Sequence, residues 1–313
     1  MSSKLTIGVL GPGAIGGMLA SILWKGGHDV ICIGKKKSVA KIKRYGISFD
    51  SQLYGNFIAK PNSVEQLNKR VDVLFISVKA PFMDDALKRI NIDSIKNGVI
   101  VPLLNGVGYS KNIRDKLGNI VAIGTIGAVE VTRNIDQLVC HISSSRPKIE
   151  IASNFDIPNT ELEKLSNILN SAGISSSVID SEEKVIWNKL VRLNAIASLT
   201  TAYQRTVGEI RTNAKLNMLL NEIVEESVLV ASHEGVLIDP QEVINQINAL
   251  PYSLKTSLQR DVMSLRHSEF ESITGGVLRL AESYGVPVPT HKYIYNLIRK
   301  KIFDSQKQNN EKN

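Results

Sequence analysis

A glycine motif near the start of the chain constrains the fold more than any other feature of the sequence. Gly11-x-Gly13-x-x-Gly16 follows a short apolar run. Behind it come a helical pattern at Ala14–Lys25 and a second strand-like run at Asp29–Ile33. A strand, a glycine loop, a helix and a strand in this order predict a unit that binds a dinucleotide, with its diphosphate at the helix N-terminus. The residues expected to bind it there are Gly11, Gly13, Ala14, Ile15 and Gly16.

The rest of the first half alternates strand-like and helical segments, which is typical of a doubly wound, mostly parallel sheet. Continuous apolar runs at Val71–Val78, Gly98–Leu104 and Ile120–Ile126 are expected to be strands buried on both faces. Gln137–Ile142 and Lys148–Ala152 follow each other with no helix between them, so we expect a hairpin at the sheet edge. These patterns predict an α/β Rossmann domain.

Helix-capping patterns mark the remaining elements. Thr160 with Glu163 predicts the start of a helix that ends at Gly173, and Ile174–Ile179 is the last expected strand. From Asp180 onward only helix signals remain. The predicted helix starts are Asp180 with Glu183, Asp239 before Pro240, and Ser268 with Glu271, and Gly285 is expected to end the last of these helices.

This organisation predicts two domains. We expect a Rossmann domain at residues 1–180 and an all-α domain at residues 181–304. Residues 305–313 are polar and are expected to form a solvated tail.

Composition and charge exclude several classes of protein. The 313 residues carry a net charge of +8, but no nucleic-acid-binding motif accompanies it, so we expect no nucleic-acid partner. No apolar run approaches the ~20 residues of a membrane span and no signal peptide is evident, so a cytoplasmic protein without membrane contact is expected. Cys32 and Cys140 lie in apolar strand-like runs and predict buried, reduced thiols. The five histidines lack ligand spacing, so no metal site is expected.

A lysine cluster follows the second strand, where folds that bind NAD usually place a carboxylate for the ribose 2′-hydroxyl. This chain has Lys35-Lys36-Lys37 there. An ammonium group attracts a 2′-phosphate, so the cluster favours NADP(H), with Lys35 as the first candidate. Without the glycine motif, a solvated charge run would be the commoner interpretation.

Two further strands end in polar residues, Lys79 and Asn105. Ligands of open α/β sheets bind at the carboxyl ends of the strands, so both residues are candidates for cofactor and substrate contact. Either could instead only start a helix or a turn, because Asn105 precedes a glycine.

Two ionisable residues of the second half are candidates for chemistry. Lys189 shares a helix face with Leu193 and Ala197, so it is expected at a buried or interdomain surface, where a partly desolvated lysine could protonate an alkoxide. Glu269 would be the first residue of a helix capped by Ser268, and a carboxylate that only stabilises that helix is the simpler interpretation.

Taken in order, these motifs resemble those of the ketopantoate reductase (2-dehydropantoate 2-reductase) family over nearly the whole chain. The matching segments are the glycine loop, Lys79-Ala80, Asn105-Gly106-x-Gly108, Trp187-x-Lys189-Leu190, Arg266-His267-Ser268-Glu269 and Gly285-Val286-Pro287-Val288-Pro289. The resemblance implies a Rossmann domain and a helical domain related to the C-terminal domain of 6-phosphogluconate dehydrogenase, with the substrate bound between them.

The resemblance also implies roles for individual residues. Lys35 falls on the family's 2′-phosphate-binding residue, and Lys79 and Asn105 fall on its cleft positions. Lys189 falls on the general acid, and Glu269 on the carboxylate that contacts the substrate or orients that lysine. Ser257 falls on a serine that contacts the substrate carboxylate.

The sequence departs from the family at three positions that usually carry asparagine, here Leu193, Ala197 and Leu254. Asn194 lies about 140° around the helix from Lys189 and is not an obvious replacement, whereas Arg192, about 60° away, could bind a carboxylate. Each lost polar contact is worth ~0.5–1.5 kcal/mol, so the substrate is less well determined than the reaction.

The combined expectation is the NADPH-dependent reduction of a small 2-oxo acid, by default ketopantoate, by a monomer or a homodimer. Lys189, Asn105 and Glu269 are the predicted catalytic residues, and Lys79 and Ser257 complete the predicted substrate contacts. A relative that reduces a less polar 2-oxo acid, and an NADP-binding sensor without turnover, remain alternatives.

Overall fold

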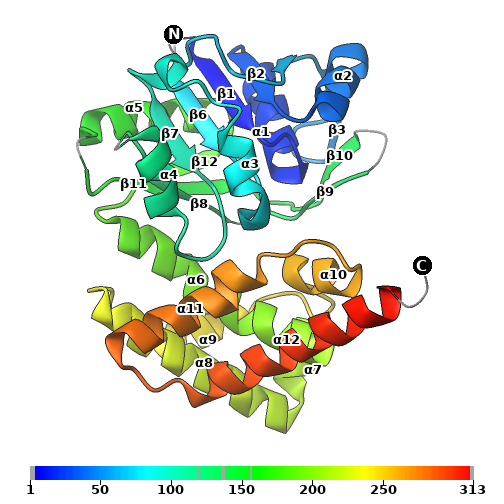
Figure 1. Cartoon of the computed structure of the whole chain (residues 1–313), viewed down its shortest axis with the longest axis vertical. Coiled ribbons are helices and arrows are strands. Elements are labelled where there is room, and N and C mark those ends of the chain that lie inside the picture. The colour runs from blue at the N-terminus through cyan, green and yellow to red at the C-terminus, as the bar shows by residue number, and fades with distance from the viewer. Residues whose placement is uncertain (1–3, 119, 128, 135–137, 156, 311–313) are drawn as a thin grey trace. The chain divides into compact units, whose positions relative to one another are not determined.

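In the computed structural model, β1 (Thr6–Leu10) is the central strand of a five-stranded parallel sheet (Figure 1). The strand order is β5-β2-β1-β6-β7. The chain runs from β1 to β2 and β5 on one side, and then crosses to β6 and β7 on the other side of β1. Such a reversal opens a crevice at the carboxyl ends of the strands, beside the glycine loop. The other strands of this sheet are β2 (Asp29–Ile33), β5 (Asn62–Val64), β6 (Val73–Ile76) and β7 (Val99–Pro102).

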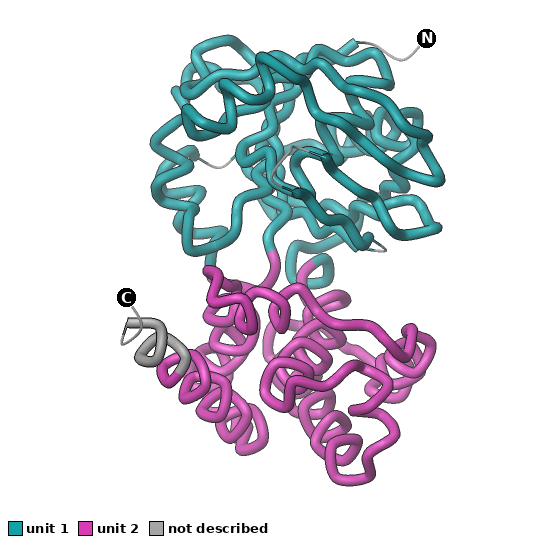
Figure 2. Tube along the Cα trace, turned by 90° about the vertical axis from the view of Figure 1, so that its right-hand side faces the viewer, with its two compact units in different colours: residues 1–104, 109–185 teal, residues 105–108, 186–313 magenta. Residues whose placement is uncertain are grey.

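The structure describes residues 4–118, 120–127, 129–134, 138–155 and 157–310. They divide into two units (Figure 2), residues 1–104 with 109–185 (unit 1) and residues 105–108 with 186–313 (unit 2). Unit 1 has the parallel α/β architecture and unit 2 is helical, so the predicted fold class is confirmed. Within the described residues no helix is both long and apolar enough to span a membrane.

Two smaller sheets complete unit 1. One has the order β4-β3-β10-β9 and the other β12-β11-β8. Helix α1 (Ala14–Lys25) packs against β1 and β2 and also against β3, β4, β9 and β10. The strands of these sheets are β3 (Ile47–Ser51), β4 (Phe57–Ala59), β8 (Ile123–Gly127), β9 (Val131–Arg133), β10 (Leu138–His141), β11 (Lys148–Ala152) and β12 (Ser175–Val178).

The hairpin predicted from Gln137–Ile142 and Lys148–Ala152 is wrong. β10 pairs with β3 and β9, whereas β11 pairs with β8 and β12. Each is an inner strand of its own sheet because Val139, Ile149 and Ile151 are fully buried. The strand expected at Ile120–Ile126 is divided between two sheets, because Val121 forms a parallel bridge with Ile100 of β7 whereas β8 pairs with β11.

The helices of unit 1 flank these sheets. The capping box predicted at Thr160 and Glu163 is wrong, because the last helix begins one residue earlier, at Asn159, after Pro158. Besides α1, the helices are α2 (Lys36–Tyr45), α3 (Met83–Leu87), α4 (Ser110–Leu117) and α5 (Asn159–Ser171), with 3₁₀ turns η1 (Ala80–Phe82) and η2 (Ile92–Ile95).

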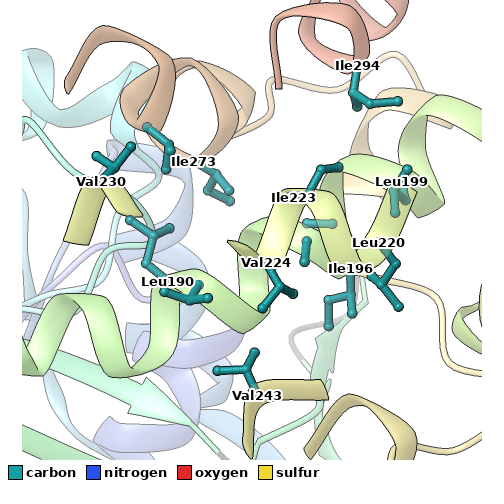
Figure 3. Close-up of a cluster of buried hydrophobic side chains, with 14 of the residues drawn as sticks. Leu190, Ile196, Leu199, Leu220, Ile223, Val224, Val230, Val243, Ile273 and Ile294 are labelled. Carbon is teal, nitrogen blue, oxygen red and sulfur yellow. The ribbon is translucent and has the colours of Figure 1, made fainter. Parts of the chain in front are cut away.

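Unit 2 is built around α6 (Glu182–Tyr203), whose residues from Ile186 onward belong to it. Its apolar side chains, Leu190 and Ile196 among them, pack with Ile223 and Val224 in one buried cluster (Figure 3). The other helices are α7 (Val207–Thr212), α8 (Ala214–His233), α9 (Pro240–Asn248), α10 (Ser257–Met263), α11 (Phe270–Tyr284) and α12 (Pro289–Asn310).

The predicted caps of these helices have mixed outcomes. Asp239 caps α9 before Pro240, and Gly285 ends α11 in the left-handed conformation with φ 68°, as predicted. Asp180 does not cap α6, because the Ser181 hydroxyl accepts the hydrogen bond from the Lys184 amide. The predicted cap Ser268 is also wrong, because Glu269 occupies the N-cap position of α11.

The C-terminal segment predicted as a polar tail is helical as far as Asn310, the last residue of α12. Residues 311–313 lie outside the described residues.

Candidate active site

The glycine loop joins β1 to α1 and holds a conformation that only glycine allows at its first position. Gly11 has φ +85°, and a Cβ there would lie 2.4 Å from the Val78 Cγ1. The Gly11 amide donates to the Ile33 carbonyl oxygen over 2.9 Å, which ties the loop to the end of β2. The turn predicted from the sequence is therefore present at this position.

The other two glycines of the motif differ in how much space surrounds them. A Cβ at Gly16 would lie 2.4 Å from both the Gly11 carbonyl oxygen and the Ser77 hydroxyl, so α1 packs too closely for any side chain. A Cβ at Gly13 would meet only the Gly11 carbonyl oxygen, at 3.9 Å. The loop is thus closed at Gly16 and open at Gly13.

The start of α1 suits an anion. Ala14 and Ile15 are its first residues, no side chain caps it, and its first turn contains no acidic residue. The amides of a first helical turn have no partner within the helix and point toward a ligand. Open space at Gly13 beside these amides fits the diphosphate of a dinucleotide.

Lys35 and Lys79 both lie in unit 1, each directly after a strand or its polar extension. Lys35 is exposed at the N-cap of α2, and its ammonium group lies 5.5 Å from the centre of the Phe82 ring. Lys79 is half-buried at the N-cap of η1, three residues past the end of β6. Both therefore lie at the carboxyl edge of the parallel sheet, as predicted.

Asn105 belongs to unit 2, because the turn at residues 105–108 packs on α11. Gly106 has φ +90° and a Cβ there would lie 1.9 Å from the Ser272 carbonyl oxygen. The Val107 amide donates to that same oxygen over 2.9 Å. A glycine at position 106 is what permits this close contact.

A chain of hydrogen bonds joins the three residues predicted to be catalytic. The Lys189 Nζ donates to the Asn105 Oδ1 over 2.6 Å, and the Asn105 Nδ2 donates to the Glu269 Oε2 over 2.9 Å. The Asn105 backbone amide also donates to the Glu269 Oε1, over 3.4 Å. One amide side chain thus connects an ammonium group to a carboxylate.

The position of Glu269 corrects the simpler interpretation of this residue. As the N-cap of α11, it makes no side-chain cap to that helix. Its carboxylate instead accepts from Asn105, because the turn at residues 105–108 lies against the start of α11. Chain order separates the two residues by 164 positions, and no local signal predicts their contact.

The surroundings of Lys189 shift its titration. The pKa of Lys189 is lowered to about 8, and burial is the main cause. The Arg192 guanidinium also contributes to the lowering, whereas the Glu269 carboxylate opposes it. The partly buried environment predicted for this lysine is confirmed, and it gives the ammonium group a pKa suited to proton transfer near neutral pH.

The remaining predicted residues of unit 2 are less closely connected to this chain. Ser257 is the exposed first residue of α10. Leu193 and Leu254 are partly buried against the helical core, and Ala197 is fully buried within it. The three positions expected from the resemblance to carry asparagine therefore hold apolar side chains, two partly buried and one fully buried.

Two polar neighbours of Lys189 on α6 have different partners. The Arg192 Nη1 donates to the Gln246 Oε1 over 3.3 Å. Asn194 is fully buried, and its Nδ2 lies 2.6 Å from the His291 Nε2. Asn194 therefore does not replace the missing asparagines, in agreement with its predicted place on the helix.

The thiols and possible metal ligands add nothing to this site. Cys32 is buried and Cys140 only half-buried, so the burial predicted for Cys140 is wrong; both are free thiols. Across the described ranges, no group of three or more His, Cys, Asp or Glu side chains could hold a metal ion.

Comparisons with known proteins match both halves of the chain to one family. Residues 7–153 match the family described as "Ketopantoate reductase PanE/ApbA", and residues 183–302 match its C-terminal counterpart, "Ketopantoate reductase PanE/ApbA C terminal".

Individual relatives are similar over almost their whole length. The "Uncharacterized oxidoreductase YkpB" of Bacillus subtilis is 24% identical over 92% of this chain and 95% of its own. The 2-dehydropantoate 2-reductase of Salmonella typhimurium is 25% identical over 95% of each chain.

Solved structures show the same fold. A D-mandelate dehydrogenase with NADH and anilino(oxo)acetate is 22% identical, with a TM-score of 0.87 over 96% of this chain and 99% of the other. A ketopantoate reductase family protein from Ralstonia eutropha has a TM-score of 0.83 at 22% identity, over 96% and 99% of the two chains.

Proposed function

This chain belongs to the ketopantoate reductase family of oxidoreductases, and on that premise we propose that it reduces a 2-oxo acid to a 2-hydroxy acid with NADPH. The observation that carries the proposal is the hydrogen-bonded chain of Lys189, Asn105 and Glu269. It places an ammonium group with a pKa of about 8 next to a fixed amide and a carboxylate. These are the groups that a ketone reduction needs for its proton.

We assign the cofactor to unit 1. The amides of Ala14 and Ile15 would hold the diphosphate, since the Gly13 amide already donates to the Gly11 carbonyl oxygen, and Lys35 would hold a 2′-phosphate. When bound, a nicotinamide cofactor supplies the hydride that adds to the keto carbon of the substrate. The dehydrogenase named above holds NADH, so the preference for NADPH rests here on Lys35 and on the absence of a carboxylate in the sequence Gly34-Lys35-Lys36-Lys37.

We assign proton transfer to unit 2. The Lys189 Nζ would donate a proton to the oxygen atom that becomes the hydroxyl group of the product. Asn105 fixes the direction of the ammonium group, because its Oδ1 accepts a hydrogen bond from one of the three N–H groups. Glu269 stabilises the charged form of the lysine and holds the Asn105 amide in the required orientation. Arg192 is a candidate to bind the substrate carboxylate, because its guanidinium lies close enough to Lys189 to lower its pKa.

The default substrate is 2-dehydropantoate, since several relatives of this chain are named 2-dehydropantoate 2-reductase. A less polar 2-oxo acid is the second candidate, because Leu193, Ala197 and Leu254 replace polar residues of the family. The similarity to a dehydrogenase whose structure holds anilino(oxo)acetate, in which a phenyl group is linked to the oxoacetate, also favours this candidate.

A panel of 2-oxo acids tests the proposal. Purified protein is mixed with NADPH and, in turn, with ketopantoate, branched aliphatic 2-oxo acids and phenylglyoxylate, and NADPH consumption is measured. Consumption with any member supports a reductase, and the order of kcat/KM values identifies the substrate class. Tight NADPH binding without consumption across the whole panel contradicts a reductase and supports a sensor.

A further inference from the structure

A half-buried arginine contacts the glycine loop from a strand far away in the sequence. Arg133 is the last residue of β9, and its Nη1 donates a hydrogen bond to the carbonyl oxygen of Pro12, the residue between Gly11 and Gly13. β9 reaches this position because it pairs with β10 and packs against α1. The Arg133 guanidinium is therefore fixed at the loop by tertiary structure.

The charge of Arg133 is not balanced by the groups around it. In the part of the chain that the structure describes, no carboxylate forms an ion pair with it. The ionisable side chain that interacts with it electrostatically is Cys32, and burial raises the pKa of that thiol to about 12, so the thiol is neutral at pH 7. A partly desolvated cation without a counter-ion is costly, and a bound anion would offset this cost.

A second cation adjoins the same turn. The ring of Pro12 packs against Gly34, since a Cβ on Gly34 would lie 3.3 Å from the Pro12 Cδ. Lys35 directly follows Gly34 and is the N-cap of α2. Pro12 is therefore bordered by the residue before Lys35 and by the guanidinium of Arg133.

The location decides which phosphate group these cations would bind. The diphosphate belongs at the N-terminus of α1, beyond Gly13. Pro12 lies on the other side of that glycine, next to the end of β2, where a fold of this kind binds the adenosine ribose. A phosphate on the ribose 2′-oxygen would lie between the end of β2 and the turn.

We propose that Arg133 is a specificity-determining residue that binds the 2′-phosphate of NADPH together with Lys35. This inference rests on the proposed cofactor class. A guanidinium offers paired N–H donors that match two phosphate oxygens, so Arg133 can hold the Pro12 carbonyl with one nitrogen and a phosphate with the others. A role confined to tethering the loop is the competing explanation, and the test separates the two.

The test measures ligand binding to the full-length protein by calorimetry, without any 2-oxo acid. Its ligands form two matched pairs, NADPH with NADH, and adenosine 2′,5′-bisphosphate with ADP. Arg133→Gln removes the charge but keeps a donor for the Pro12 carbonyl, whereas Arg133→Lys keeps the charge. Arg44→Met, on the exposed end of α2, is a control that removes one positive charge elsewhere in unit 1.

We expect Arg133→Gln to weaken the binding of NADPH and adenosine 2′,5′-bisphosphate about tenfold or more, and that of NADH and ADP less than about threefold. Arg133→Lys should retain most of the preference, and Arg44→Met should retain all of it. Lys35→Met should act in the same direction as Arg133→Gln.

Equal losses for phosphorylated and unphosphorylated ligands would overturn the inference, because a loop tether affects both alike. A native protein that binds NADH as tightly as NADPH would overturn it as well. If NADPH binding depends on Arg133 but no 2-oxo acid is reduced, the reductase proposal fails and this inference stands. If Arg133→Gln does not fold, Lys35→Met decides, since an unchanged ratio of NADPH to NADH affinity in that variant contradicts the binding of the 2′-phosphate by Lys35 and Arg133 together.

Discussion

Asn105 accepts a hydrogen bond from the Lys189 ammonium group, with 2.6 Å between Oδ1 and Nζ. The orientation of the amide is fixed, because its Nδ2 donates to the Glu269 carboxylate at the same time. The lysine is therefore held by an oxygen that cannot turn away without breaking a second hydrogen bond. As a consequence, the Lys189 ammonium group can donate its proton from a defined direction.

The titration of Lys189 predicts how the reaction depends on pH. The lysine must be protonated to donate, and its pKa is about 8. The reduction rate should therefore be level below that pH and fall about tenfold per pH unit above it. A profile of kcat against pH measures this limb, and a rate that stays level well above pH 8 would count against the assigned acid.

Two substitutions should move that limb in opposite directions. Glu269→Gln removes a carboxylate that raises the pKa of Lys189, so the limb should shift to lower pH. Arg192→Met removes a guanidinium that lowers it, so the limb should shift to higher pH. Gln keeps the length of the Glu side chain, and Met keeps an unbranched apolar stem at position 192. Shifts in the same direction would show that the limb belongs to another group.

The glycine loop predicts different effects for two of its glycines. Gly13→Ala adds a methyl group to open space, so the protein should unfold at an unchanged Tm but bind NADPH roughly tenfold more weakly or worse. Gly16→Ala places a Cβ against the Gly11 carbonyl and the Ser77 hydroxyl, and should lower the Tm by several degrees. Thermal unfolding and calorimetry on the two variants check this, and unchanged NADPH binding by Gly13→Ala would exclude the loop as the diphosphate site.

A hydrogen-bonded carboxylate predicts the acid stability of unit 2. The Glu226 Oε2 lies 2.6 Å from the His291 Nδ1, and the amides of Thr290 and His291 also donate to this carboxylate. Burial alone would raise the pKa of Glu226, but these hydrogen bonds outweigh it and hold the pKa below its usual value. A depressed pKa stabilises the fold above the unfolded-state value, and this contribution is lost as the pH falls through the folded-state value.

Glu226→Ala should therefore lower the free energy of unfolding by about 1–3 kcal/mol at neutral pH, and by less in acid. Glu225→Ala, on the exposed side of the same helix, is the matched control and should change it little. Denaturant titrations at pH 7 and at pH 4 measure both variants. A loss at Glu226 that is the same at both pH values would contradict the role of this ionised carboxylate.

The sequence predicts those features that depend on local patterns. The glycine motif gives α1 its start, and Asp239 and Gly285 mark helix ends correctly because a cap is set by the residue and its immediate neighbours. The apolar face around Lys189 likewise predicts its partial burial, since helical spacing alone determines which residues share a face.

The features that the sequence does not reveal depend on contacts between distant segments. The composition of β10 and β11 predicts that they are strands, but not which strands they pair with. Their pairing buries Val139, Ile149 and Ile151, and this burial depends on tertiary structure. From the sequence, Glu269 is interpreted as a first-turn acid of α11. Its contact with the Asn105 amide exists because the turn at residues 105–108 packs on α11. Nothing around Arg133 in the sequence indicates that it contacts Pro12.

The most direct test of the whole account is the turnover of Lys189→Ala with the best 2-oxo acid of the panel. We expect kcat to fall about 10²–10⁴-fold while the dissociation constant for NADPH stays within about threefold, because the lysine supplies the proton and does not hold the cofactor. Lys184→Ala removes another lysine of the same helix, one whose ammonium group pairs with Asp180, and should keep full turnover. Unchanged kcat in Lys189→Ala would contradict the assignment of this residue as the acid.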